Sequence, residues 1–291
     1  MTRLTAVAAR AESLLGTSVV ATAPVAGGDV CTCTKLRLSD GSTALIKTLP
    51  AASDGFFAAE ARGLRRLSDA IGASAGLLVP DLLGHDHDCL ILRWIEPGKP
   101  TVDAATAFGR GLAALHRSPA GNDFGAETDG FIGPLPMKNA PAPAWAEFFA
   151  TRRVLPYLRV ARDRGAVTID DADIIEQAAL KTADVVPEEP AALLHGDLWN
   201  GNVLWGADGV VAVIDPATYA GHREVDLAML ALFGLPHLPR VLGAYAEAAP
   251  LVEGWEDRLV FHQLFPLLAH ACRFGGAYGA RATEIARRFA G

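Results

Sequence analysis

Cysteine is scarce in this sequence, with four residues in a chain of 291. Only Cys31 and Cys33 lie close together, and zinc sites do not use a Cys-Thr-Cys spacing. Cys89 and Cys272 stand far apart along the chain. The sequence therefore predicts no disulfide framework and no cysteine zinc site, which is typical of a protein of the reducing cytoplasm.

Long apolar runs and an excess of basic residues are also missing. The N-terminal stretch MTRLTAVAARAESLL is interrupted by Arg10 and Glu12 and repeats apolar residues at helical spacing, unlike a signal peptide. No uncharged run is long enough to span a bilayer, so no membrane partner is expected. The formal net charge is −7. Because binding to phosphate backbones requires a basic face, no nucleic-acid partner is expected either.

The composition itself is that of a globular chain, since 51% of the residues are hydrophobic and 20% are charged. The first 95 residues predict a small sheet that carries one main helix. A short helix is expected over 1–16, apolar strand-like runs over 18–25, 30–38, 43–49, 77–83 and 89–95, and a helix over 53–71 capped by Ser53. The Asp-Gly turn in SDGS predicts that the second and third runs form a hairpin.

The segment EPGKP at 96–100 separates this sheet from a mainly helical region. Helices are expected over 102–116, 144–164, 170–182, 223–233, 238–248 and 255–272. Among them, 191–214 contains short strand-like runs, with GADG as the turn of a hairpin. The predicted fold class is therefore α+β, with a small mostly-β lobe at 1–95 and a larger mostly-α lobe at 96–291.

The stretch LHGDLWNGNVLW at 194–205 carries the strongest chemical signal. Asp197 follows one apolar run, Asn202 enters the next, and Asp215 ends the one after that. A hairpin brings Asn202 and Asp215 together as oxygen ligands of the kind that Mg²⁺ prefers beside substrate phosphates. Asp197 can then accept a hydrogen bond from a hydroxyl, as in phosphoryl-transfer enzymes. Each residue alone is more often a turn cap, but the ordered set favours the catalytic interpretation.

A kinase also needs a cation on the ATP phosphates and an acid that holds this cation. Lys47 lies at the end of the third strand-like run, and Glu60 lies in the helix that follows. A strand lysine alone more often extends its ammonium group to solvent. Together with the motif of the second lobe, the two residues predict an ion pair that positions phosphates.

Two further segments are candidate nucleotide contacts. Gly27 and Gly28 lie between the first two strands and are expected to form the turn over the phosphates, although a plain hairpin turn requires glycine equally. Arg93, Trp94 and Ile95 lie where the two lobes join, and their backbone groups are expected to contact the adenine.

These motifs resemble the fructosamine kinase family, also called ketosamine-3-kinases, over most of the chain. LLHGDLWNGNVLW is similar to the catalytic loop of that family, and VIDPATYAGHREVDLAMLALFG is similar to its metal loop and following helix. FIGPLPMKNAPAPAWAEFFATRRVLPYLR and FHQLFPLLAHACRFGGAYG resemble its insert and its C-terminal helix. The His-Gly-Asp element alone would also fit aminoglycoside and choline kinases.

The resemblance implies a bilobal protein-kinase-like fold and transfer of the ATP γ-phosphate to the 3-hydroxyl of a ketosamine, a glycated amine, in deglycation repair. It assigns Asp197 as the catalytic base and Asn202 and Asp215 as Mg²⁺ ligands. It assigns Lys47 and Glu60 as the pair that positions the phosphates. The implied partner is a small-molecule or protein-bound ketosamine, and the sugar, the amine and the oligomeric state stay open.

Other residues receive roles by the same resemblance. Trp199 is expected to be a wall for the sugar or a packed core indole. His195 is expected to orient the catalytic loop, and Asp226 to anchor it through backbone N–H groups. His222, Arg223 and Glu224 either shape the acceptor site or pack in the core.

Some positions depart from the family pattern or leave alternatives open. Ala269 stands where Asn is expected before a histidine, and Arg93 stands where relatives often carry an acid. Cys31 and Cys33 follow the glycine turn, where a redox switch and simple packing are both considered. The competing functions are a related kinase of aminoglycosides, choline-like compounds or sugar alcohols, and a nucleotide-binding regulator without catalysis.

Overall fold

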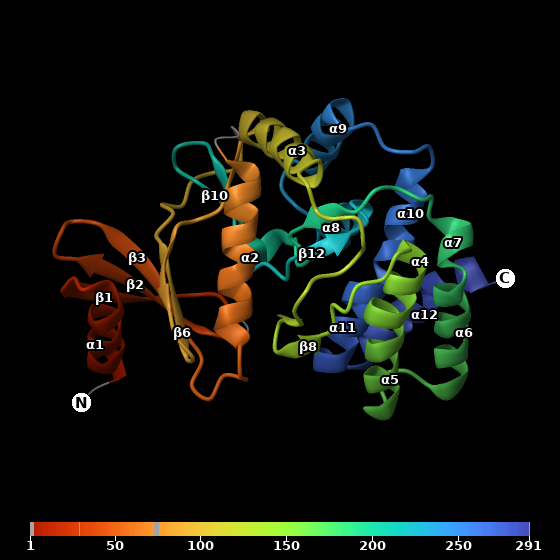
Figure 1. Ribbon diagram of the computed structural model, residues 1–291, viewed down its shortest axis with the longest axis horizontal. Helices are drawn as coiled ribbons and strands as arrows, with labels where there is room; N and C mark the ends of the chain where they lie inside the picture. The colour runs from red at the N-terminus through yellow and green to blue at the C-terminus, as the bar shows by residue number, and fades with distance from the viewer. Residues whose placement is uncertain (1–2, 29, 73–75, 291) are drawn as a thin grey trace.

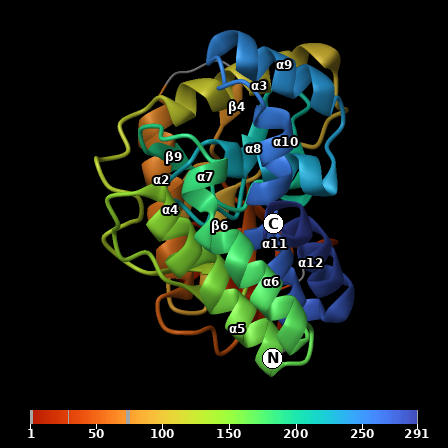
Figure 2. The same cartoon turned by 90° about the vertical axis from the view of Figure 1, so that its right-hand side faces the viewer.

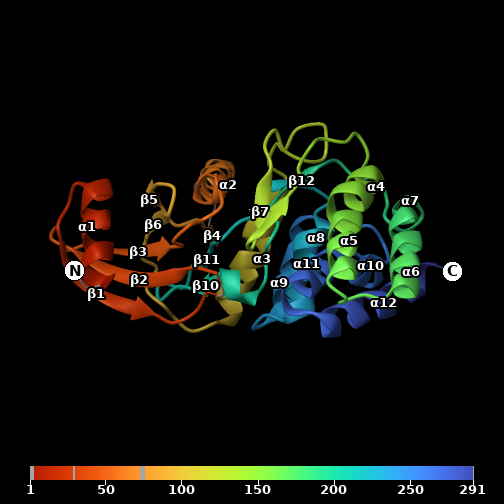
Figure 3. The same cartoon turned by 90° about the horizontal axis from the view of Figure 1, so that it is seen from below.

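The computed structural model describes residues 3–28, 30–72 and 76–290 and has two regions (Figure 1). A β-sheet lies at the N-terminal end and helices fill the C-terminal end, with α2 (Phe56–Ile71) standing between them in Figures 1 and 3. The expected α+β class is confirmed. None of the described helices is both long and apolar enough to cross a membrane.

The first region is built on a five-stranded antiparallel sheet in the order β1-β2-β3-β6-β5. Its strands are β1 (Val19–Val25), β2 (Thr32–Leu38), β3 (Thr43–Thr48), β5 (Leu82–His85) and β6 (Cys89–Arg93). Leu36 and Leu38 of β2 are buried, so the alternation in this strand marks the core face as expected. The predicted hairpin of β2 and β3 is confirmed, and α1 (Arg3–Leu15) packs beside β1 and β5.

The helix α2 begins later than expected, at Phe56, and the predicted cap is wrong. Ser53 accepts the backbone N–H of Phe56 with its carbonyl oxygen, and its side chain caps nothing. Gly55, with φ 79°, precedes the helix in the left-handed region that favours glycine. The buried stripe of α2 includes Phe57, Glu60 and Leu64, so Glu60 is directed into the protein.

Helices make up most of the second region. They are α3 (Val102–His116), α4 (Trp145–Phe148), α5 (Leu155–Asp163), α6 (Ile169–Leu180), α7 (Thr182–Val185), α8 (Glu224–Phe233), α9 (Leu238–Ala248), α10 (Trp255–His262), α11 (Leu264–Phe274) and α12 (Gly276–Ala290). The expected helix over 144–164 is α4 and α5 joined by a π-helical segment, Phe149–Val154. Pro156 cannot donate to the carbonyl of Arg152, which instead accepts from the guanidinium of Arg153 at 3.2 Å.

The C-terminal end differs more from the sequence prediction. The expected helix over 255–272 breaks at Gln263 into α10 and α11, and α12 was not predicted at all. Gly275 ends α11 with φ 95°, and the chain resumes a helix at once. Gly279 lets α12 approach closely, since a Cβ there would lie 2.0 Å from the carbonyl oxygen of Ala166. Figure 2 shows α12 beside α6 and α11.

Small sheets connect the two regions. β10 (Val203–Trp205) and β11 (Val211–Val213) form the expected hairpin, and β4 (Leu77–Leu78) adds to β11 in parallel. Thus β4, which precedes residue 95, belongs to the sheet of the second region. β9 (Ala192–Leu194) pairs with β12 (Tyr219–Gly221), and β7 (Gly130–Ile132) with β8 (Leu135–Met137).

Candidate active site

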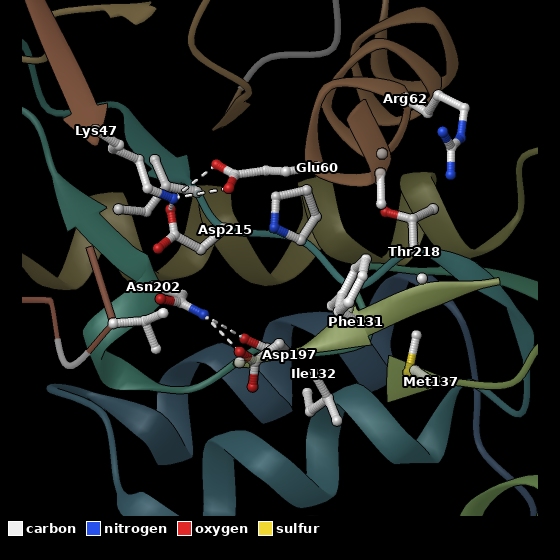
Figure 4. Close-up of a pocket in the computed structure, with 18 of the residues that line it drawn as sticks. Lys47, Glu60, Arg62, Phe131, Ile132, Met137, Asp197, Asn202, Asp215 and Thr218 are labelled. Atoms are coloured by element: carbon white, nitrogen blue, oxygen red, sulfur yellow. Dashed lines mark hydrogen bonds and ion pairs between the residues drawn. The ribbon is translucent and has the colours of Figure 1, made fainter. Parts of the chain in front are cut away.

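A cavity of about 1260 Å³ lies between the sheet region and the helical region. Its lining contains most of the residues that the sequence singles out, and Figure 4 shows how the central ones face one another. These lining residues are Gly27, Gly28, Lys47, Glu60, Arg93, Trp94, Ile95, Asp197, Trp199, Asn202 and Asp215. The fold therefore brings residues that are up to 188 positions apart in the sequence into one site (Gly27 to Asp215).

Lys47 is the buried cation of this cavity. Its ammonium donates to both oxygens of Glu60, at 2.7 and 2.9 Å, and to Oδ1 of Asp215 at 2.7 Å (Figure 4). Its side chain is 5% exposed. Burial alone would lower the pKa of Lys47, but the charges of Asp215 and Glu60 raise it above its usual value, so the ammonium stays charged. Burial raises the pKa of Glu60 to about 7, against the opposing effect of Lys47.

Asp215 follows β11 in an unusual backbone conformation. Its φ of 57° lies in the left-handed region, which residues other than glycine rarely adopt. Residues held in this conformation cluster at functional sites. The side chain is 36% exposed toward the cavity. Oδ1 accepts from Lys47, and no described residue donates to Oδ2. One carboxylate oxygen of Asp215 therefore remains available to a ligand.

Asn202 and Asp197 form the second half of the centre. The side-chain N–H groups of Asn202 donate to the backbone oxygen of Asp197 at 2.8 Å and to its Oδ2 at 3.2 Å. Because both contacts use the amide nitrogen, the carbonyl oxygen of Asn202 is left for another partner. Burial raises the pKa of Asp197 to about 7, and the charge of Asp215 acts in the same direction. The hydrogen bond from Asn202 and the charge of Arg273 oppose this shift.

Asp226, in the first turn of α8, anchors the loop that contains His195 and Gly196. Its carboxylate accepts the backbone N–H groups of His195 at 2.8 Å and Gly196 at 2.9 Å. It also contacts Nε2 of His116 at 3.1 Å, and all of these groups are buried. His116, which sequence reasoning missed, lies in α3 without any local signal. Gly196, with φ 82°, cannot be replaced, because a Cβ there would lie 2.1 Å from the oxygen of Ala217.

His195 links the catalytic loop to the loop that carries Asp215. Its Nε2 donates to the carbonyl oxygen of Ile214 at 2.9 Å, and its Nδ1 accepts the backbone N–H of Asp197 at 3.3 Å. Burial lowers the pKa of His195. The geometry supports the expected structural role of His195, since both of its ring nitrogens already have backbone partners.

Comparisons with known proteins agree with this arrangement. The family model for fructosamine kinase matches residues 3–290. This chain belongs to the fructosamine kinase family. A probable ketoamine kinase of Enterococcus faecium is 36% identical over 274 residues, which cover 91% of this chain and 94% of that protein.

Solved structures place the family within a wider fold. A protein of Thermobifida fusca, provisionally named a fructosamine-3-kinase, matches with a TM-score of 0.90 and 48% identity over 97% of each chain. A spectinomycin phosphotransferase crystallised with ADP and spectinomycin is 13% identical, with a TM-score of 0.60 over 98% of this chain and 93% of that chain. The expected bilobal kinase-like fold is thereby confirmed.

Trp199 both lines the cavity and packs within this fructosamine kinase family member, and its contact with a sugar stays a prediction. Its ring lines the cavity and also packs edge-on against Phe233, with ring centroids 5.7 Å apart. A Cβ at Gly201 would lie 2.4 Å from the indole, so glycine at this position leaves room for the ring. Trp199 is thus a fixed wall of the cavity.

The expected acceptor role of His222, Arg223 and Glu224 does not agree with the fold. None of the three lines the cavity, and both His222 and Glu224 are completely buried. Arg223 pairs with Glu189 at 2.6 and 2.7 Å, and Glu224 accepts three hydrogen bonds from Arg258. These three residues lie at the N-terminal end of α8 and contact neighbouring segments there, so their role is packing.

The insert between α3 and α4 supplies a wall that the residue spacing alone did not predict. Phe131, Ile132 and Met137, from the hairpin of β7 and β8, face the cavity (Figure 4). His270 and Arg273 of α11 line it as well. The Gly-Pro step between two apolar runs at 131–137 was the available signal for this hairpin.

The two departures from the family pattern both line the cavity. Ala269 lies beside His270 in α11. Arg93, at the end of β6, pairs with Asp81 through Nε at 2.9 Å and is exposed. The guanidinium of Arg93 therefore contacts Asp81. Arg93 also lines the edge of the cavity, because it lies where the two lobes join.

The glycine turn and the two cysteines form another part of the wall. Gly27 and Gly28 have φ values of 111° and 90°, which favour glycine. Cys31 and Cys33 also line the cavity. Burial raises the pKa of Cys31 to about 12, and it raises the pKa of Cys33 as well. Both are therefore protonated thiols at neutral pH, a state that does not favour rapid oxidation.

Proposed function

We propose that this protein is an ATP-dependent kinase that transfers the γ-phosphoryl group to the 3-hydroxyl of a ketosamine. One observation carries the proposal. Lys47, Asp197, Asn202 and Asp215 meet in one cavity of a chain that belongs to the fructosamine kinase family. Each of these four residues has a distinct part in phosphoryl transfer.

Lys47 and the glycine turn would hold the nucleotide. Glu60 fixes the ammonium of Lys47 at the inner end of the cavity, where it can neutralise phosphate oxygens. Gly27 and Gly28 expose backbone N–H groups without side chains that would block the phosphates. The adenine would lie against the backbone of Trp94 and Ile95. The spectinomycin phosphotransferase with the same fold was crystallised with ADP.

The donor set of the cavity fits Mg²⁺. Asp215 offers Oδ2 and Asn202 offers its carbonyl oxygen, since their remaining polar atoms are already paired. Two hard oxygen ligands from the protein leave room for phosphate oxygens, which Mg²⁺ prefers. When bound there, the ion would neutralise negative charge on the transferred phosphoryl group and favour the ionised form of Asp197.

Asp197 would act on the acceptor. Its carboxylate, anchored by Asn202, accepts the proton of the ketosamine 3-hydroxyl as that oxygen attacks the γ-phosphorus. A bond forms between the acceptor oxygen and phosphorus, and the bond from phosphorus to the β–γ bridging oxygen breaks, which releases ADP. Asp226 and His195 hold the loop so that this carboxylate stays in position.

The biological setting follows from the family resemblance. A ketosamine 3-phosphate is unstable and sheds its sugar, so the reaction would serve deglycation repair. The acceptor is a small-molecule or protein-bound ketosamine. The four free cysteines agree with a reducing cytoplasm as the compartment.

A coupled assay of ADP release tests the proposal. Ribulosamine, erythrulosamine and fructosamine derivatives of lysine are compared with an aminoglycoside and with choline. We expect turnover of at least one ketosamine, with NMR locating the new phosphate on the 3-hydroxyl. Turnover of only choline or the aminoglycoside would transfer the assignment to those kinases. Tight ATP binding without turnover of any acceptor would indicate a non-catalytic regulator.

A further inference from the structure

Arg273, in the last turn of α11, lines the cavity. Its guanidinium carbon lies 4.5 Å from the ring centroid of Phe274. A Cβ at Gly133 would lie 3.0 Å from Nη1 of Arg273, so the guanidinium also covers the turn between β7 and β8. Its position is therefore set from two sides, by α11 and by the insert hairpin.

Within the described chain, Arg273 differs from the other buried and half-buried arginines. Each of the others has a hydrogen bond or an ion pair with another residue of the protein; they are Arg10, Arg66, Arg152, Arg153, Arg223, Arg240 and Arg258. Arg273 has neither with any described residue, and its one ring contact leaves the edge donors of the guanidinium unused. A guanidinium is always charged, and a partly buried one is stabilised by an anion.

The location of Arg273 relative to Asp197 indicates which ligand can supply that anion. Arg273 and Asp197 line the same cavity, so a molecule bound there can contact both. The neighbouring wall is the apolar surface of Phe131, Ile132 and Met137, away from Lys47 and Glu60 (Figure 4). A molecule whose hydroxyl reaches Asp197 from this side would present its remaining groups to Arg273.

We propose that Arg273 binds an anionic group carried by the ketosamine, and that this residue makes the enzyme prefer negatively charged acceptors. A guanidinium fork matches a carboxylate or a phosphate with two parallel hydrogen bonds. The anion is either the carboxylate of the amino-acid part or a phosphate on the terminal hydroxyl of the sugar. This inference rests on the proposed ketosamine kinase activity and adds the charge of its substrate.

Three matched acceptors test the inference. They are the fructosamine of glycine, the neutral fructosamine of glycinamide, and the latter with a phosphate on the terminal sugar hydroxyl. We expect the wild-type protein to favour at least one charged acceptor by roughly ten- to a hundredfold in kcat/KM, mostly through KM. Arg273→Gln should remove that preference, so that kcat/KM for the charged acceptors falls to the level of the glycinamide acceptor in the same variant. Any effect that the lost charge has on Asp197 is common to the three acceptors and cancels in this ratio. Arg273→Lys should keep part of the preference, and the exposed Arg281→Gln should change nothing.

The outcomes separate the inference from the proposed function. Whichever charged acceptor depends on Arg273 identifies the anion as carboxylate or phosphate. Equal rates for charged and neutral acceptors overturn the inference while the kinase assignment stands. An equal loss on all three acceptors in Arg273→Gln also overturns it, because it indicates a structural or transition-state role. If no acceptor is phosphorylated, the proposed function is wrong, and calorimetric binding of the glycine and glycinamide compounds still decides whether Arg273 recognises the anion.

Discussion

Among the described residues, the buried charges around Lys47 and those around Glu224 have opposite surroundings. In the cavity, Lys47 contacts two acids, and Asp215 keeps an oxygen open to a ligand. Behind α8, Glu224 is enclosed by Arg258 and two histidines, and its side chain is completely buried. Similar groups of charges therefore face a cavity in one place, where a ligand can reach them, and are enclosed by the fold in the other.

The sequence motif did not reveal this difference. Glu224 and Asp226 stand two residues apart in α8, and both are acids inside the helical lobe. Asp226 points toward the catalytic loop, whereas Glu224 points toward α10. Neighbours in a conspicuous motif thus serve separate networks, because successive side chains of a helix face different directions.

The most severe break in the cavity cluster should come from Asp197→Asn. Removing the general base should lower kcat by about 10²–10⁴-fold, since a neutral amide cannot accept the hydroxyl proton. Steady-state kinetics with a ketosamine measure kcat, and calorimetry should show nearly unchanged ATP binding. Full turnover of Asp197→Asn would contradict the assignment of the base.

Arg258→Met should destabilise the buried cluster around Glu224. This change leaves Glu224 buried without its main partner, so the free energy of unfolding should fall by about 3–5 kcal/mol. Urea unfolding measures the loss, and the exposed Arg159→Met is the matched control. Stability equal to that of the control would show that the histidines alone hold Glu224.

Asp215→Ala should affect the cavity cluster through its nucleotide. Loss of the carboxylate should weaken binding of Mg²⁺-ATP by roughly ten- to a hundredfold, because one charged ligand is removed. Titration with ATP in the presence and in the absence of Mg²⁺ separates the metal contribution. The exposed Asp173→Ala should behave like the wild type. Unchanged affinity for Mg²⁺-ATP in Asp215→Ala would count against the ligand role.

Mild acid should act on the buried cluster around Glu224 with a smaller effect. Burial and the neighbouring His262 lower the pKa of His222 to about 3, although Glu224 opposes the shift, and Arg223 and Arg258 add to it. The unfolded chain takes up this proton near pH 6.5 and the folded chain does not, so the contribution of His222 to stability should fall as the pH drops below 6.5. From pH 6.5 to pH 5 the loss should be about 2 kcal/mol.

Lower pH should add the contribution of Glu224. Burial alone would raise the pKa of Glu224, but His262 and Arg258 lower it to about 2. Its stabilising contribution is complete above about pH 4.5 and is lost as the pH falls toward 2. Urea unfolding at several pH values measures both effects. The difference in stability between the wild type and His222→Gln isolates this residue and should change steadily between pH 6.5 and pH 5, whereas the exposed His237→Gln should run parallel to the wild type. A difference that does not vary with pH would contradict the shift of His222.

The sequence indicated which residues meet at the centre of the cavity because these signals are local. The alternation in β2 indicates which of its side chains face the core, and the hairpin turn pairs β10 with β11. Asn202 lies just before β10, and Asp215 lies shortly after β11. The same reasoning could not find pairings between distant segments. The parallel contact of β4 with β11 leaves no pattern in two residues, and neither does the contact of His116 with Asp226.

No helix was expected after residue 272, but α12 follows at the C-terminal end. Gly275 ends α11. Gly276 nevertheless begins α12, because packing against α6 and α11 outweighs the low helix propensity of its glycines. Arg273 lies just before these two glycines, so its place in the cavity depended on a packing arrangement that propensity does not encode.

The three contacts of Lys47 have a consequence for nucleotide affinity. All three N–H donors of its ammonium are already engaged, two by Glu60 and one by Asp215. In the proposed reaction, a phosphate oxygen that reaches this lysine would replace one of these carboxylate contacts, and Asp215 is the more exposed of the two acids. Nucleotide entry would then exchange one anion for another, and the released carboxylate of Asp215 would be free to turn toward a cation that accompanies the phosphates.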